Sequence, residues 1–258
     1  MKESDRELLW KNTIGFLRQG QEFLRKYGVA RKRGVLLLGE PGNGKTTACK
    51  WLYSESQRRG LMWKAVNAQQ FLNASNRNAT QQLFDLDDAG VILFDDFDKA
   101  LWDRGDDGAD FNLATFLTEL DGLQPREGVV YIFTSNAKLK DLDSAFRRPG
   151  RIDLVLEFNC PSAELRRQFI EDRWHTDIRE AIDIERAVQQ TERYSFADLE
   201  ELRKLMVLHF MEHDEWDWEA ARGVFVASRP KTKPTGTLGF RAAEPRPTST
   251  TVARLGTL

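Results

Sequence analysis

The chain reads Gly34-Val-Leu-Leu-Leu-Gly-Glu-Pro-Gly-Asn-Gly-Lys-Thr46, and this stretch decides the fold. It begins with a continuous apolar run, which is typical of a β-strand buried on both faces of a sheet. The following segment, Gly39–Thr46, fits the pattern G-x-x-x-x-G-K-[ST] at every fixed position. A helix is predicted directly after it, over Thr46–Arg59. Because glycines let successive backbone N–H groups approach phosphate oxygens, and a helix N-terminus adds partial positive charge, the sequence predicts a phosphate-binding loop here.

Each part of this loop has an expected role toward a nucleotide. Lys45 is expected to reach the β- and γ-phosphates, and the hydroxyl group of Thr46 is expected to bind Mg²⁺. The alternative interpretation is a glycine-rich turn without a ligand. The residues expected to contact the nucleotide are Pro41, Gly42, Asn43, Gly44, Lys45, Thr46 and Thr47.

A second polar site follows another apolar run, Val91-Ile-Leu-Phe-Asp95-Asp96. Ligands of parallel sheets bind at the carboxyl ends of the strands, so these carboxylates are expected to face the phosphate loop. Asp95 is predicted to hold Mg²⁺, directly or through water, and Asp96 to orient and polarise the attacking water. The alternative is a capping carboxylate in a polar loop.

Apolar runs and helical patterns alternate along the first two thirds of the chain. This order predicts an α/β fold, a doubly wound parallel sheet. After Pro161 only helical patterns follow, which marks a change to a small helical domain. The expected organisation is an amphipathic helical segment over 1–27, an α/β core over 28–160, a helical lid over 161–227 and an extended tail over 228–258. Strands are expected at 34–38, 63–66, 91–94, 129–133 and 154–158, and helices at 5–27, 46–59, 71–84, 111–123, 165–174, 183–192, 196–212 and 215–226.

The composition of the 258 residues limits the class of protein. Hydrophobic residues make up 41% and charged residues 30%, which excludes wholesale disorder. With 38 Lys and Arg against 40 Asp and Glu, a protein-wide surface for polyanions is not expected. The charged N-terminus and the short apolar runs predict a cytoplasmic protein without a membrane span. Residues 227–258 hold six basic residues and one acidic residue, so this tail is either a frayed end or an arm that docks on a partner.

Four further segments of the sequence resemble motifs of a known protein family. The segments Phe116–Gly122, Tyr131–Asn136, Leu142–Asp153 and Tyr194–Leu199 resemble, in order and spacing, motifs of the AAA+ ATPases, AAA proper subgroup. The likeness covers about residues 20–226. Before the phosphate loop, Gln21–Gly34 looks most like the branch that contains the mitochondrial inner-membrane AAA translocase, although that branch's membrane span and N-terminal domain do not occur here.

This resemblance implies ATP and Mg²⁺ as cofactors and a homo-oligomeric ring of six or seven subunits. It implies that Asn136 contacts the γ-phosphate or the attacking water, and that Arg148 and Arg151 reach the γ-phosphate of the next subunit. For Asn136 the alternative is a turn-forming residue, and for the arginines it is a surface salt bridge. Tyr27, Gly28 and Ala197 are the candidate walls of the adenine pocket, and the sequence does not fix which of them contacts the base.

Three departures from the family pattern bear on function. Asp96 stands where the family usually has Glu, which shortens the side chain by one methylene group and predicts slower hydrolysis unless the loop shifts to compensate. The segment Gln70–Thr80 lacks the aromatic–glycine pair with which many relatives grip a threaded chain, and Phe196 stands where glycine is more common. The acidic, glycine-rich loop Trp102–Asp110 either lines a pore or is a surface loop.

Taken together, the expected function is an ATP-hydrolysing AAA+ ring that remodels or assembles protein partners. One alternative is a scaffold that nucleotide binding locks and that hydrolyses ATP only residually. Another alternative, kept open by the basic tail, is a nucleic-acid-associated motor or loader.

Overall fold

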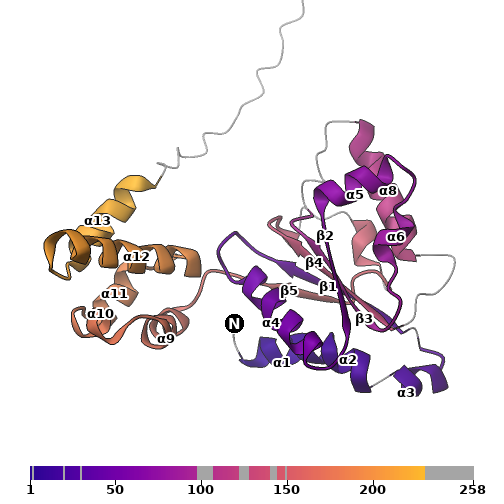
Figure 1. Ribbon diagram of the computed structural model, residues 1–258, viewed down its shortest axis with the longest axis horizontal. Helices are drawn as coiled ribbons and strands as arrows, with labels where there is room; N and C mark the ends of the chain where they lie inside the picture. Colours follow the sequence, from indigo (N-terminus) through magenta and orange to yellow (C-terminus); the bar gives the residue numbers. More distant parts are fainter. Residues whose placement is uncertain are drawn as a thin grey trace, which may run out of the picture.

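The computed structural model describes residues 1, 3–19, 21–29, 31–97, 107–121, 128–139, 144–148 and 150–229. Its centre is a five-stranded sheet in the order β2-β3-β4-β1-β5, in which every paired neighbour is parallel (Figure 1). This confirms the predicted α/β fold with a doubly wound parallel sheet. The strands are β1 (Lys32–Leu38), β2 (Met62–Asn67), β3 (Gly90–Asp95), β4 (Val129–Ser135) and β5 (Leu154–Glu157).

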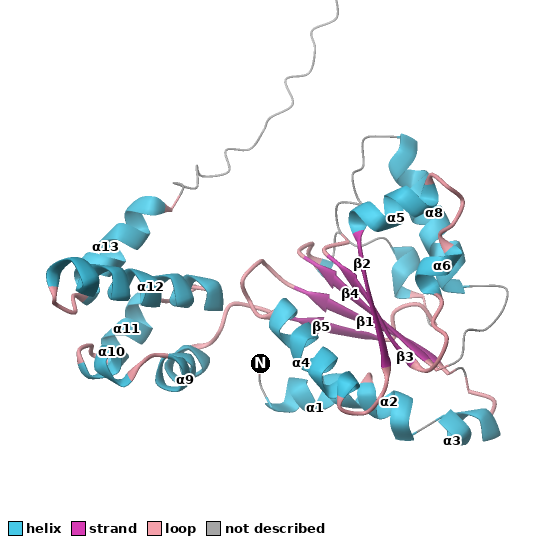
Figure 2. Cartoon of the chain, in the orientation of Figure 1, coloured by secondary structure: helices cyan, strands magenta, loops and turns pink. Residues whose placement is uncertain are grey.

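Helices cover both faces of the sheet (Figure 2). One face packs against α1 (Glu3–Lys11), α2 (Ile14–Gln19) and α4 (Lys45–Gln57). The other face packs against α5 (Ala68–Ser75), α6 (Gln81–Phe84) and α8 (Asp107–Asp121). A short helix, α3 (Gln21–Lys26), precedes β1.

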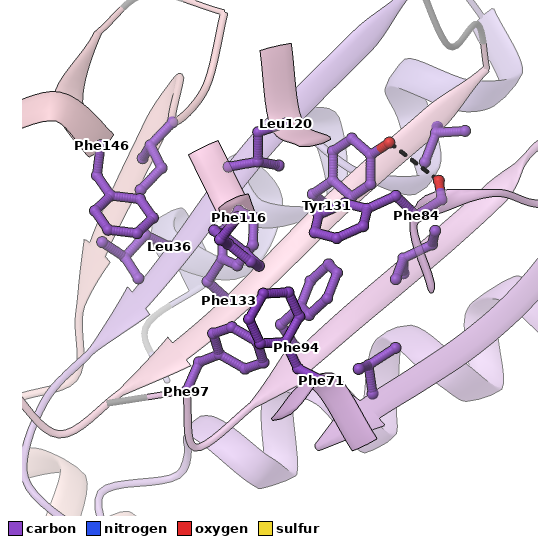
Figure 3. Packing of buried hydrophobic residues seen from close by; sticks show 14 of the residues in the cluster. Leu36, Phe71, Phe84, Phe94, Phe97, Phe116, Leu120, Tyr131, Phe133 and Phe146 are labelled. Atoms are coloured by element: carbon purple, nitrogen blue, oxygen red, sulfur yellow. Dashed lines mark hydrogen bonds between the residues drawn. The ribbon is translucent and has the colours of Figure 1, made fainter. Parts of the chain in front are cut away.

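The central strands supply both cores by simple alternation, because successive side chains of a strand point to opposite faces of the sheet. One set joins a core rich in rings, here called the aromatic core: Leu36, Leu38, Ile92, Phe94, Tyr131 and Phe133. The residues between them join the other core, here called the aliphatic core: Val35, Leu37, Val91, Leu93, Val130 and Ile132. In the aromatic core the rings of Phe71, Phe84, Phe94, Phe97 and Phe116 meet mostly edge to face (Figure 3).

A third core lies in the helices that follow the sheet, which Figure 1 shows to one side of it. These helices, called the C-terminal bundle below, are α9 (Ala163–Arg173), α10 (Thr176–Glu180), α11 (Ile184–Gln190), α12 (Phe196–His213) and α13 (Trp218–Ser228). Side chains of Ser162, Asp183, Ser195 and Asp217 accept backbone hydrogen bonds at helix starts, as expected of N-cap residues. Among the described residues, no helix is both long and apolar enough to cross a membrane.

Several predicted elements differ in detail. The single helix predicted over 71–84 is wrong, because α5 ends at Ser75 and Asn78 adopts a left-handed backbone with φ 51°. The helical pattern over 5–27 forms three short helices, and α10 and the 3₁₀ turn η2 (Ser144–Arg147) were not expected. Residues 230–258 of the expected tail, and residues 102–106 of the acidic loop, lie outside the described residues.

Gly34 in β1 marks a very close approach of two chain segments. Its N–H donates to Asp153 Oδ2 over 2.9 Å, and its carbonyl accepts from the N–H of Asp153 over 2.9 Å. A Cβ atom built on Gly34 would lie 1.7 Å from the carbonyl oxygen of Arg151. Only glycine therefore fits between β1 and the segment that carries Arg151.

Candidate functional site

The glycine-rich loop connects β1 to α4, as the sequence predicted. Gly42 and Gly44 have φ of 83° and 100°, in the left-handed region that favours glycine. A Cβ atom on Gly42 would lie 2.8 Å from the Cβ of Ala197 and 2.8 Å from Ser195 Oγ. At Gly42, the backbone conformation and the close contact with Ala197 and Ser195 thus both exclude a side chain.

Lys45 is buried, and its ammonium group has a full set of hydrogen bonds. Nζ donates to the carbonyl oxygen of Gly39 over 2.5 Å, to that of Glu40 over 3.2 Å, and to Asn136 Oδ1 over 2.8 Å. Three donors therefore meet three acceptors, two of which belong to the loop itself. The contact with Asn136 joins the phosphate loop to the carboxyl end of β4.

The two predicted carboxylates lie at the end of β3, next to Thr134 and Asn136. Thr134 Oγ1 donates to Asp95 Oδ1 over 2.7 Å and accepts from the N–H of Asp96 over 2.8 Å. Asn136 Nδ2 is 3.4 Å from Asp96 Oδ1. One hydrogen-bonded network therefore joins Lys45 to Asn136 and Asp96. Thr134 extends this network to Asp95.

Thr134 is the member of this network that sequence reasoning missed. It lies two residues before Asn136, so the alternation of a strand places both on the same face. That spacing, together with a hydroxyl side chain at the end of a buried apolar run, was the available signal.

Asp96 itself has a left-handed backbone with φ 47°. Asp and Asn visit this region more readily than longer side chains do. The conformation is held by the bond to Thr134 and by the next residue, since the N–H of Phe97 donates to the carbonyl oxygen of Thr134 over 3.3 Å. The ring of Phe97 packs 5.1 Å from that of Phe94, so the turn with both carboxylates is bracketed by two buried rings.

The helix after the loop contributes a buried thiol. Burial, together with the nearby charge of Asp95, raises the pKa of Cys49 to about 12 against a lowering effect from Lys45. The thiol is therefore neutral at ordinary pH and acts as a small apolar group of the aliphatic core.

The start of α12 contacts the loop directly. The N–H of Ala197 donates to the carbonyl oxygen of Gly42 over 3.2 Å. Ser195 and Asp198 form a capping box at this helix start, and Arg229 pairs with Asp198 at 2.5 Å. Although burial opposes it, the hydrogen bonds from Arg229 and Ser195 lower the pKa of Asp198.

A cleft of about 510 Å³ opens beside the phosphate loop. Its lining includes Gly39, Glu40, Asn43, Asn136, Cys160 and Arg193. The Oδ1 atom of Asn43 is buried and lacks a hydrogen-bond partner among the described residues. Together with the bare glycine backbone, this unsatisfied acceptor fits a site that receives a polar ligand.

The two predicted arginines lie after η2 and differ in placement. Arg148 is exposed, whereas Arg151 is 8% exposed and turned inward. Arg151 Nε donates to Asp121 Oδ1 over 2.8 Å, a second guanidinium nitrogen binds Asp121 Oδ2, and Nη1 donates to the carbonyl oxygen of Ala145 over 2.6 Å. The hydrogen bonds from Arg151 lower the pKa of Asp121. Neither arginine joins the network around Lys45.

Three other residues predicted to contact the nucleotide have exposed side chains. Pro41, Thr46 and Thr47 are exposed at the loop and the first turn of α4. Within the described ranges, no three His, Cys, Asp or Glu side chains gather as a metal site. The donors expected for Mg²⁺, the Thr46 hydroxyl and the Asp95 carboxylate, are hard oxygen ligands, and they fit an ion that takes its other ligands from phosphate and water.

Known proteins are similar in sequence to this chain over most of its length. The chain is 30% identical over 210 residues to "ATPase family gene 2 protein homolog A" of Homo sapiens, covering 77% of this chain and 23% of that protein. It is 28% identical over 188 residues to "Cell division control protein 48 homolog B" of Arabidopsis thaliana, covering 69% and 31%. It is 32% identical over 200 residues to "ATP-dependent zinc metalloprotease FtsH 3" of Sphaerobacter thermophilus, covering 72% and 40%.

The chain thus spans less than half the length of each of these relatives. None of the three is named as a mitochondrial translocase, so that part of the resemblance stays a prediction. Residues 35–160 match the family described as "ATPase family associated with various cellular activities (AAA)", which covers the sheet, the phosphate loop and the network around Lys45. Residues 35–160 are thus similar to an AAA-family domain.

Proposed function

We propose that the chain binds and hydrolyses ATP with Mg²⁺ and works as an oligomeric ring that remodels or assembles protein partners. The observation that carries this proposal is the hydrogen-bonded chain from Lys45 through Asn136 to Asp96 beneath a bare glycine loop. It places a cation, an amide and a carboxylate at the carboxyl edge of one parallel sheet, where such sheets bind ligands. Relatives named as an ATPase-family protein and as an ATP-dependent protease support the same activity.

Each residue of the network has a task in this proposal. ATP and Mg²⁺ would supply the phosphoryl group and the charge neutralisation of the reaction. Lys45 would exchange the carbonyl oxygens of Gly39 and Glu40 for phosphate oxygens, while Thr46 and Asp95 would hold the metal ion. Asp96 would accept a hydrogen bond from the attacking water, and Asn136, already bonded to Lys45 and Asp96, would keep both groups in register.

In this proposal Arg148 reaches a neighbouring subunit more readily than Arg151 does. Arg151 must first release Asp121 before it can do so, whereas the exposed Arg148 has no such barrier. The proposal therefore gives Arg148 the transition-state contact in the ring, and gives Arg151 a contact that requires its intramolecular pair to open.

The first test compares ATP turnover of Lys45→Ala with that of Lys50→Ala, an exposed lysine on the same helix. Lys45→Ala is expected to lower turnover by about 10²–10³-fold, because it removes a positive group at the developing charge. Lys50→Ala should turn over like the parent protein. Equal turnover of parent and Lys45→Ala would overturn the proposed ATPase.

The ring is tested by mixing two inactive variants. In a mixed ring, an Arg148→Ala subunit keeps its phosphate loop and can receive Arg148 from a Lys45→Ala neighbour. Each variant alone is expected to lose most turnover, with arginine fingers contributing about 10³–10⁵ in rate. The mixture should regain a measurable part of it. A mixture no more active than its components, or a particle that sediments as a monomer with a non-hydrolysable ATP analogue, would contradict the ring.

The nucleotide-locked scaffold remains the second candidate because of Asp96. Asp96 has a short side chain on a left-handed backbone, and its backbone N–H donates to Thr134. Together these features limit how far the carboxylate extends. Asp96→Glu restores the longer side chain and Asp96→Asn removes the charge. A large gain in turnover for Asp96→Glu, with little loss for Asp96→Asn, would favour the scaffold over the motor.

A further inference from the structure

The end of α13 is tied by charge to the start of α12, and Arg229 makes the contact. Arg229 is the C-cap residue of α13. Its Nη2 atom lies 2.5 Å from Oδ1 of Asp198, in the first turn of α12. The side chain of Arg229 is 41% exposed and that of Asp198 is 26% exposed. The ion pair is therefore partly shielded from water, which makes it stronger than a pair on the open surface.

Two aromatic rings hold the same guanidinium group. Its Cζ atom lies over the ring of Tyr194, 4.4 Å from the centroid, and over the ring of Phe225, 4.5 Å from the centroid. A cation within about 6 Å of an aromatic face is attracted to the ring. Tyr194 directly precedes the N-cap of α12, and Phe225 belongs to α13. The guanidinium group of Arg229 is thus fixed in place by contacts from both helices.

The first turn of α12 continues this series of contacts to the phosphate loop. Asp198 Oδ2 accepts from the N–H of Ser195 over 2.7 Å, and the N–H of Asp198 donates to Ser195 Oγ over 3.1 Å. Ser195 Oγ lies 2.8 Å from where a Cβ atom of Gly42 would be. The N–H of Ala197 donates to the carbonyl oxygen of Gly42 over 3.2 Å. Contacts therefore run without a break from the end of α13 to the backbone of the loop.

We propose that Arg229 is a positioning residue for the phosphate loop, because it holds the first turn of α12 against Gly42 through Asp198. The inference rests on the proposed nucleotide binding and adds a residue that does not touch the nucleotide. Glycine has more backbone freedom than any other residue, so a loop built on it needs support from outside. A loop that is already held in its binding conformation loses less entropy when the ligand binds.

A simpler role for Arg229 makes a different prediction. A cation near the C-terminus of a helix stabilises that helix through the helix dipole. In that case the loss of the charge would lower the stability of α13 and leave the affinity for nucleotides unchanged. The positioning role requires that the affinity falls as well.

The test measures the affinity of the full chain for ADP and for ATPγS, each with Mg²⁺, by isothermal titration calorimetry. Arg229→Met keeps a long apolar stem over the two rings and removes the charge. It is expected to weaken the binding of both nucleotides about threefold to fivefold, the upper range for a partly exposed ion pair. Both should be affected alike, because the loop binds phosphates that they share. Arg229→Lys keeps the charge and should recover most of the lost affinity.

A matched variant separates the positioning of the loop from the stability of the bundle. Arg186→Met removes the charge from another ion pair of the bundle, in which Arg186 lies 2.6 Å from Glu219 and joins α11 to α13. Both methionine variants should lower the Tm by at most about 4 °C. Arg186→Met should bind both nucleotides like the parent protein.

A double-mutant cycle tests the path through Asp198. Asp198→Asn keeps an acceptor for the capping box and removes the charge, so it should lose about as much affinity as Arg229→Met. The double variant should lose little more than either single variant, because the two residues act as one unit. Losses that add in full would show that Arg229 does not act through Asp198, and would overturn the proposal.

The remaining outcomes distinguish this inference from the function on which it rests. Unchanged affinity in Arg229→Met, or an equal loss in Arg186→Met, would overturn the positioning role while nucleotide binding stands. An equal loss in Arg229→Lys and Arg229→Met would also overturn it, since the charge would then not hold the turn. If the parent protein binds neither nucleotide, or binds no better than Lys45→Ala, the proposed function fails and this inference fails with it.

Discussion

The aromatic and aliphatic cores share the same strands but stabilise different parts of the site. Rings fill the aromatic core, and two of them, Phe94 and Phe97, flank the turn that carries Asp95 and Asp96. The aliphatic core lies under α4, the helix that begins at Lys45. Edge-to-face rings have a specific geometry, whereas aliphatic side chains tolerate exchanges of similar volume. The difference teaches that ring packing supports the turn with the carboxylates in addition to its bonds to Thr134, whereas the lysine is held by its own hydrogen bonds.

The largest expected effect compares one deletion in each core. Phe116 contacts the rings of Phe71, Phe84, Phe94 and Phe97, while Leu52 is the fully buried aliphatic residue of α4. Phe116→Ala should lower the free energy of unfolding by about 4 kcal/mol and Leu52→Ala by about 3 kcal/mol, since a larger ring leaves a larger cavity. Urea denaturation measures both. A cost for Leu52→Ala that equals or exceeds that of Phe116→Ala would remove the energetic distinction between the cores.

A second comparison removes a ring with only a modest loss of volume. Phe97→Leu is expected to cost about 1.5 kcal/mol of stability and to lower ATP turnover about tenfold, because the turn with Asp96 loses the ring that holds it. The matched exchange in the aliphatic core, Leu93→Met, should cost a similar free energy and leave turnover unchanged. Turnover and urea denaturation are measured on both variants. If the two exchanges lower turnover equally, the aromatic core has no special part in positioning the carboxylates.

The parts of the molecule that sequence patterns predicted well are those fixed by local chemistry. The glycine loop, Lys45 and the ends of β3 and β4 follow from motifs whose residue types are dictated by phosphate and metal binding, and the topology brings them to one edge. Strand positions followed from apolar runs that must be buried on both faces.

What could not be predicted depends on tertiary contacts. The helix break at Asn78, the left-handed turn at Asp96 and the inward turn of Arg151 each need a partner distant in sequence or a φ that no periodicity records. Likewise, only the placement of α11 and α12 beside the loop shows that Arg193 lines the cleft. Motifs therefore identify residue types, while contacts decide which residues act.

Helix α8, one of the helices that cover the aromatic core, is also held by an ion pair. The stability of the fold is therefore expected to depend on pH. Asp121 ends α8, and its pKa is lowered in the folded protein by Arg151, so the ion pair stabilises the fold above the unfolded pKa of about 3.9. Asp121→Asn should cost about 1 kcal/mol at pH 7, a modest value because Asp121 is exposed. This difference should vanish as the pH falls through the folded pKa, below about 4.

Urea denaturation between pH 7 and pH 3 follows this effect. Asp87→Asn, which changes an exposed carboxylate elsewhere, should differ from the parent by less than about 0.5 kcal/mol across the range. A difference for Asp121→Asn that stays constant down to pH 3, or grows with acidity, would contradict a stabilising carboxylate.

The smallest effect concerns the one thiol of the aliphatic core. Cys49 is buried with a pKa raised to about 12, whereas Cys160 is exposed. At pH 8 a thiol reagent such as DTNB should react rapidly with one equivalent per folded chain and with two after unfolding in urea. Cys160→Ser should abolish the rapid phase. Rapid reaction of both thiols in the folded chain would show that the aliphatic core opens readily.

The absence of a side chain at residue 34 has a mechanical consequence. With 1.7 Å between a would-be Cβ and the carbonyl oxygen of Arg151, β1 and the segment bearing the arginines are in backbone-to-backbone contact with no compressible layer between them. A shift of the strand under the phosphate loop must then displace that segment by a similar amount. In the ring proposed above, occupancy of one subunit's loop would in this way be transmitted to the segment that carries Arg148 and Arg151 without any lever or long side chain.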